Sequence, residues 1–113
     1  MTTREQIKGY QEEILKGNLL PQRTAEMLVE ISALIGSINS EILRTDMEYN
    51  LALKNALAVA KTASTAKIEV GTTKEYLEKH TARNAKEEAI EMMRSLKYML
   101  KAFKDEYEAS INL

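Results

Sequence analysis

The sequence predicts an all-α protein, and three observations lead to this class. Among 113 residues only one is proline and four are glycine, so few positions interrupt a helix. Tryptophan is absent and phenylalanine occurs once, whereas six methionines and many small or aliphatic residues favour packing of helix against helix. Apolar residues also recur at helical spacing along most of the chain. We therefore expect one all-helical domain over residues 1–113.

The first element is expected to be a short helix within residues 1–20. Lys16-Gly17-Asn18 is typical of a helix end, because glycine tolerates the left-handed backbone that stops a helix. Pro21 suits the first position of a following helix. The start carries two alternative pairs with the spacing of a capping box, Thr2 with Glu5 and Thr3 with Gln6.

A long helix is expected over residues 21–70. Twelve positions at alternating spacings of three and four form a stripe, here called the seam, and eleven of them are apolar or aromatic, with Thr45 as the exception. Such a stripe predicts a partner helix. Residues 36–40, which begin with Gly36, are the place where a kink is conceivable, but we expect the helix to continue. The seam positions are 31, 35, 38, 42, 45, 49, 52, 56, 59, 63, 66 and 70.

Gly71-Thr72-Thr73 predicts a turn into a second long helix over residues 73–112, and Thr72 with Glu75 repeats the capping-box spacing. Folding at Gly71 sets the alanines of the two helices opposite each other and large side chains opposite large ones. This match favours an antiparallel helical hairpin. A hairpin so long and thin exposes apolar surface, so we expect it to assemble as a homo-oligomeric, coiled-coil-like bundle. The returning helix has its own seam at positions 82, 85, 89, 92, 96, 99 and 103.

The charges of the chain are distributed unevenly around this turn. Residues 54–86 carry seven basic and three acidic side chains, and residues 49–68 contain no acid. A basic hairpin end of this kind favours a polyanion, most simply nucleic acid, although a solvated helix face is the alternative. Tyr49 and Tyr76 could stack on unpaired bases, which favours single-stranded DNA, while core packing also explains Tyr49. The predicted nucleic-acid-binding residues are Lys54, Lys61, Lys67, Lys74, Lys79, Arg83 and Lys86.

Catalysis, a cofactor and a metal site are not expected. The chain has one histidine and no cysteine, and it lacks a glycine-rich phosphate loop and a zinc-protease motif. His80 is interpreted as a partly exposed surface residue. The acids Glu87, Glu88 and Glu91 lack the spacing of a carboxylate metal centre and are interpreted as a solvated face.

The cellular location of the protein is predicted from two features that are missing from the sequence. The first residues are polar, which argues against a signal peptide, and no apolar run has the length of a membrane span. We therefore expect a cytoplasmic protein without membrane contact. Acidic and apolar residues at the open end of the hairpin, between positions 26 and 48 and between 105 and 108, fit either an oligomer interface or a docking site for a basic protein.

Some of these features resemble a known group of proteins. They are the run from Glu41 to Leu57, the break near Gly71, the return rich in lysine and alanine, and Ser95-Leu96-Lys97-Tyr98. Over residues 28–112, in helix order and character, the chain resembles small helical phage proteins of recombination, the UvsY-like recombination mediators. The resemblance implies an oligomer that binds single-stranded DNA and helps to load a recombinase.

Two functions are therefore predicted. The first is a non-enzymatic, oligomeric helical protein that binds nucleic acid through its basic end, with single-stranded DNA favoured, as a phage recombination or replication accessory. The alternative is a protein-interaction module (an adaptor, an assembly factor or a host-directed phage inhibitor) that accepts a partner helix and does not bind nucleic acid.

Overall fold

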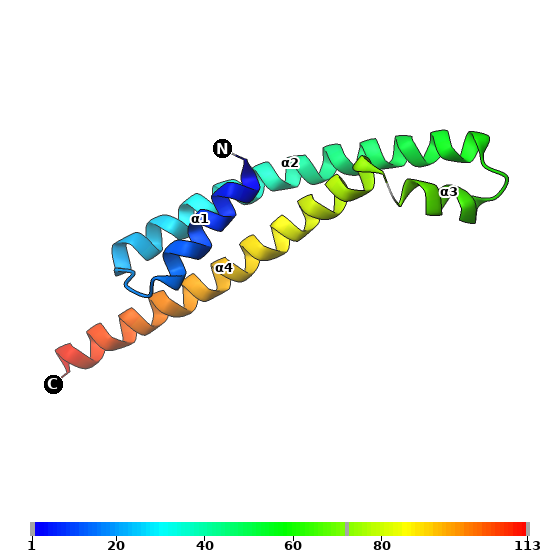
Figure 1. Ribbon diagram of the computed structural model, residues 1–113. Helices are drawn as coiled ribbons and strands as arrows, with labels where there is room; N and C mark the ends of the chain where they lie inside the picture. Colours follow the sequence, from blue (N-terminus) through cyan, green and yellow to red (C-terminus); the bar gives the residue numbers. More distant parts are fainter. Residues whose placement is uncertain (1, 72, 113) are drawn as a thin grey trace. The chain divides into compact units, whose positions relative to one another are not determined.

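The computed structural model describes residues 2–71 and 73–112, which form helices and no strand (Figure 1). This confirms the all-α class. The packing divides into two compact units. One, here called the terminal unit, joins the residues up to Gly36 with those from Glu87 onward; the other, the central unit, is Ser37–Lys86. The helices are α1 (Thr3–Leu15), α2 (Pro21–Val59), α3 (Ala63–Val70) and α4 (Lys74–Ile111).

The local signals at the start of the chain are confirmed. The Thr2 side chain accepts a hydrogen bond from the Glu5 backbone N–H at 3.2 Å, so the first of the two capping pairs is the one that forms. Gly17 has a φ of 74° and lies where the chain leaves α1, as the glycine stop predicts. Pro21 is the first residue of α2.

The terminal unit has a core of large side chains. It combines α1, the first turns of α2 and the part of α4 that follows Glu87. Aliphatic side chains from all three segments are excluded from solvent, so this unit is a small three-helix assembly with a conventional core. Its buried apolar residues are Ile7, Met27, Ile31, Ala89, Met92 and Leu96.

A forked ion pair joins α1 to α2 in this unit. Arg23 donates to Glu13 Oε2 through Nε at 2.5 Å and to Glu13 Oε1 through Nη2 at 2.9 Å, and its Nη1 reaches Glu30 at 3.0 Å. The hydrogen bonds from Arg23 hold the pKa of the Glu13 carboxyl below its ordinary value, and those same bonds raise the pKa of the guanidinium.

The central unit is built mainly on small residues. It contains α2 from Ser37 to Val59, all of α3, and α4 from Lys74 to Lys86. Ile38 is its one large side chain that is completely buried among the described residues. Thr45, the polar exception in the seam, is also buried, and its hydroxyl donates to the Ile42 carbonyl at 3.1 Å. The other buried residues are Ala66, Val70, Ala82 and Ala85.

The helix expected over residues 21–70 is interrupted, and this part of the prediction is wrong. α2 continues through Gly36, as expected, but ends at Val59. Residues 60–62, which lie outside the helices, follow, and the chain reverses there rather than at Gly71 (Figure 1). The cause is local: the Thr62 side chain accepts a hydrogen bond from the Thr65 N–H at 3.1 Å and thereby starts α3.

Gly71 therefore has a different role from the one predicted. Its φ of −61° and ψ of −14° are right-handed helical values that any residue adopts, so the site needs no glycine for its backbone angles. Thr72, with its expected pairing to Glu75, lies outside the described residues. Thr73 caps α4, since its hydroxyl accepts from the Tyr76 N–H at 3.4 Å and donates to the Val70 carbonyl at 2.6 Å.

The displaced reversal changes which residues of α2 and α4 meet. Asp46 pairs with Arg83, and Tyr49 contacts Tyr76, so the two helices are antiparallel in the central unit. A fold at Gly71 would instead have set Asp46 opposite Lys97. The predicted register is thus wrong by about four helical turns. The seams themselves are correct from Ile31 to Ala56 on α2, where every seam position is buried or half-buried.

Candidate nucleic-acid interface

All seven cations predicted to bind nucleic acid lie in the central unit. They come from α2, from the connection between α2 and α3, from α3 and from the first turns of α4. Lys79 and Lys86 are half-buried and the other five are exposed, namely Lys54, Lys61, Lys67, Lys74 and Arg83.

Three of these cations interact with neighbouring side chains. Arg83 Nη2 donates to Asp46 Oδ2 at 2.6 Å, and Lys74 Nζ lies 3.6 Å from Glu78 Oε1. The ammonium group of Lys79 lies over the Tyr49 ring, 4.1 Å from the ring centroid. Arg83 and Lys79 therefore join α4 to α2, a structural role that sequence reasoning did not assign to them.

Three exposed lysines of the set remain without an acidic partner in the described part of the chain. Lys54, Lys61 and Lys67 take part in none of the ion pairs found among residues 2–71 and 73–112. They lie within residues 49–68, the stretch that contains no acid. Their charge is available to an external anion.

Beside Lys79 lies an aromatic cluster that the sequence did not reveal. The rings of Tyr49 and Tyr76 have centroids 6.1 Å apart and are tilted by 50°, and those of Tyr76 and His80 are 4.3 Å apart and tilted by 54°. His80 is exposed and Tyr76 is 37% exposed. The signal available in the sequence was the spacing of four between Tyr76 and His80, which sets both rings on one face of a helix.

The two units differ in formal charge. The central unit carries eight basic and six acidic side chains, a net charge of +2, whereas the terminal unit carries eight and eleven, a net charge of −3. The excess of positive charge predicted for residues 54–86 is therefore partly offset by acids of α2 such as Asp46 and Glu48.

A second basic face, on α4 in the terminal unit, also escaped sequence reasoning. Arg94, Lys97, Tyr98 and Lys101 line a hollow of about 360 Å³. The Tyr98 side chain is 76% exposed, and Arg94 lies 2.5 Å from Glu91. The spacing of three and four residues was visible in the sequence.

A metal site and a membrane-spanning helix were also sought among the described residues. Among residues 2–71 and 73–112, no three histidine or acidic side chains lie close enough together to hold a metal ion. None of the described helices combines the length and the apolar character that a membrane crossing requires. His80, interpreted from the sequence as a partly exposed surface residue, is exposed and contacts Tyr76.

The fold and site thus define the class of the protein: all-α, with long antiparallel helices and a central unit that combines unpaired lysines with an exposed aromatic cluster. No protein-family model, no curated protein and no solved structure matches this chain.

Proposed function

We propose that the central unit binds nucleic acid, and single-stranded DNA in preference to duplex. The observation that carries this proposal is the coexistence of two features in one unit: exposed lysines without acidic partners, and a tilted group of aromatic rings with Tyr76 and His80 at the surface. Lysines attract phosphates at any sequence, and aromatic faces stack on bases that are not already paired.

Each feature contributes a different part of the interaction. Lys61 lies in the connection after α2 and Lys67 in α3, and neither forms an ion pair within the described chain. Tyr76 makes tilted ring contacts with both Tyr49 and His80, so its position is fixed before a base arrives. A fixed platform loses less conformational entropy on binding than a free side chain.

The test is a fluorescence-anisotropy titration of labelled single- and double-stranded oligonucleotides at several salt concentrations. The wild type should bind single strands more tightly, and its affinity should fall steeply with salt because bound counterions are released. A double substitution, Lys61→Ala with Lys67→Ala, should flatten the dependence of log K on log salt by roughly 0.7 per lost phosphate contact. Tyr76→Leu should weaken single-strand binding with the salt slope unchanged.

A matched control is the pair Lys97→Ala with Lys101→Ala, which removes the same charge from exposed positions outside the central unit. Loss of binding in this control and not in the Lys61/Lys67 variant would move the site to the basic face of α4 around Tyr98. Absence of binding to any oligonucleotide at low salt would reject the proposal. The resemblance to UvsY-like mediators supports a role beside a recombinase, which adding a recombinase and measuring its loading would examine.

A protein-interaction module remains the second candidate function, and one observation favours it. Three large apolar side chains of α2 in the central unit, Leu43, Met47 and Leu51, are 60–64% exposed. Surface of this kind is characteristic of contact with another protein. A module of this type would be indifferent to the changes at Lys61 and Lys67.

A further inference from the structure

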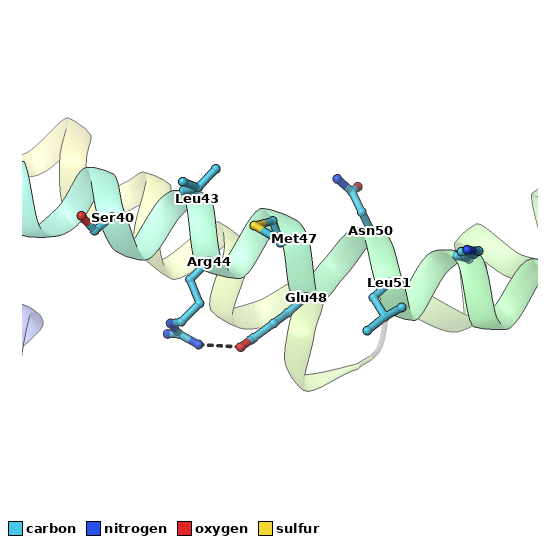
Figure 2. Close-up of a pocket in the computed structure, with 8 residues that line it drawn as sticks. Ser40, Leu43, Arg44, Met47, Glu48, Asn50 and Leu51 are labelled. Atoms are coloured by element: carbon cyan, nitrogen blue, oxygen red, sulfur yellow. Dashed lines mark hydrogen bonds and ion pairs between the residues drawn. The ribbon is translucent and has the colours of Figure 1, made fainter.

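An apolar stripe runs along the outer face of α2 in the central unit. Leu43 and Met47 are each 64% exposed and Leu51 is 60% exposed, and they border a hollow of about 770 Å³ (Figure 2). The three residues are spaced by four, so they lie one above another on the helix. This face lies away from the seam, whose residues Ile38 and Thr45 are buried inside the unit.

The stripe is symmetric about its central residue. Met47 lies in the middle, with a leucine four residues before it and a leucine four residues after it. Seven residues away in either direction are Ser40, which is small, and Lys54, which is long and flexible; both border the hollow. An isologous, two-fold interface between antiparallel helices requires self-complementary partners, and a two-fold axis at Met47 pairs Leu43 with Leu51 and the small Ser40 with the long Lys54.

The charges beside the stripe have the same self-complementary character. Arg44 and Glu48 lie on one flank, where Arg44 Nη1 donates to Glu48 Oε1 at 2.9 Å, and Asn50 projects from the other flank (Figure 2). A two-fold axis at Met47 keeps the charged flanks of both helices on the same side. It also places Arg44 of one copy near Glu48 of the other. The two residues differ in height along the helix axis by about 3 Å, which is less than one turn.

We propose that this face of α2 binds a second copy of the chain, with the two α2 helices antiparallel and crossing at Met47. In this arrangement Leu43 of each copy packs against Leu51 of the other, and two Arg44–Glu48 pairs close across the interface. The small Ser40 leaves room for the aliphatic part of Lys54. The proposal is independent of nucleic-acid binding, because it rests on none of the residues substituted in that test.

The first experiment measures the mass of the full-length chain by sedimentation equilibrium from low micromolar to several hundred micromolar concentration. We expect a monomer–dimer equilibrium that Met47→Lys weakens by at least about tenfold, because two like charges then meet at the axis. Leu77→Lys is the matched control, since Leu77 is 66% exposed on α4 of the same unit and should leave dimerisation unchanged. A wild type that stays monomeric, or a dimer that Met47→Lys does not affect, would overturn the proposal.

The second experiment fixes the orientation through disulfide trapping, which is clean because the natural chain has no cysteine. Met47→Cys should form a covalent dimer under mild oxidation. Leu43→Cys alone should not, since the two copies of this residue would lie about 12 Å apart along the axis, beyond the ~7 Å that a disulfide spans between Cα atoms. A mixture of Leu43→Cys and Leu51→Cys chains should cross-link. Efficient trapping of Leu43→Cys alone would indicate parallel helices and refute the arrangement.

The third experiment separates the pair between copies from the pair within one copy. Arg44→Glu and Glu48→Arg chains should each dimerise poorly, because like charges meet at both ends of the interface. Mixed together they should form a heterodimer more readily than either forms a homodimer, since every pair is then opposite in charge. If Arg44 and Glu48 interact only within one helix, the mixed dimer would form no more readily than the homodimers. That result would count against the proposal.

Discussion

The two units of this protein solve the same packing problem with different side chains. In the terminal unit the buried residues are large, with Ile7, Met27 and Leu96 almost completely excluded from solvent. In the central unit three of the six buried residues among those described are alanine and only Ile38 is large, while large residues such as Leu51 and Leu77 are exposed. Small residues let helices approach closely, but they remove little apolar area from water, and burial is worth only about 25 cal/mol per Å².

This difference indicates which unit contributes more to stability and which unit offers more surface to a partner. The terminal unit buries several large apolar side chains, although Leu15, Val29 and Tyr98 are exposed, and it adds the Arg23 fork to Glu13. The central unit leaves apolar and cationic groups outside, where another molecule can reach them. A surface of this kind contributes to function only on contact with a partner, so both of our proposals concern the central unit.

The largest expected effect comes from truncating the cores. Leu96→Ala in the terminal unit should lower the free energy of unfolding by ~2–5 kcal/mol, and Ile38→Ala in the central unit should do likewise, because both side chains are completely buried. Thermal melts followed by circular dichroism measure the size of each effect. Amide hydrogen exchange shows which unit loses protection, and selective loss in the truncated unit would sharpen the division between them.

The control for these truncations is Val29→Ala, which removes an apolar side chain that is 71% exposed on α2. This change should leave the melting temperature within one or two degrees of the wild type. Melting temperatures unaffected by Leu96→Ala or Ile38→Ala would mean that the seam does not hold the core.

An intermediate effect is expected at the ion pair of the terminal unit. Glu13→Gln should cost about 1 kcal/mol at pH 7, the upper end for a partly exposed pair, because the fork to Arg23 is bidentate. The folded-state pKa of Glu13 lies below its unfolded value of 4.5, so its contribution is complete above pH 4.5 and declines as the pH falls toward the folded value.

Urea titrations of both proteins at pH 7 and at about pH 3 measure this dependence. The gap in stability between wild type and Glu13→Gln should narrow in acid, where the wild-type carboxyl takes up a proton. A gap that stays constant would show that charge at Glu13 does not hold α1 to α2.

The smallest effect is expected in the central unit. Lys79→Gln removes the ammonium group that lies over the Tyr49 ring and should cost about 0.5 kcal/mol, the value for an exposed cation–π contact. Lys86→Gln, one heptad further along α4 and also half-buried, is the control. Upfield shifts of the Lys79 side-chain protons in NMR spectra report the contact directly, and ordinary shifts there would contradict it.

Much of the helical content was predictable because its signals are local. The cap at Thr2, the left-handed Gly17 and the initial Pro21 each act within one turn of the chain, and the seam from Ile31 onward reports burial on one helix face. Such signals do not depend on distant partners.

The reversal after Val59 was missed for a physical reason. Alanine is the best helix former and also fits a seam, so the pattern continues from Ala56 through Val59 to Ala63 although α2 ends at Val59. The informative residue was Thr62, whose hydroxyl starts a new helix.

The error in the predicted position of the reversal also made the predicted contacts at the candidate site wrong. A register displaced by about four turns separates Tyr49 from Tyr76 and Asp46 from Arg83, so neither the aromatic cluster nor the ion pair could be derived from the sequence. The excess of basic side chains in residues 54–86 needed no register, so it could be predicted from the sequence, whereas the contacts of those side chains could not.

The three-residue reversal at the end of α2 also bears on how this protein tolerates changes in length. α3 spans eight residues, about one heptad, so it is matched by the last heptad of α2. Removing or adding residues in both arms together would keep Asp46 opposite Arg83, because equal changes on each side of the reversal cancel. A single insertion in one arm would rotate that arm by about 100° and misalign its buried alanines. Insertions and deletions among natural relatives should therefore occur here in compensating pairs.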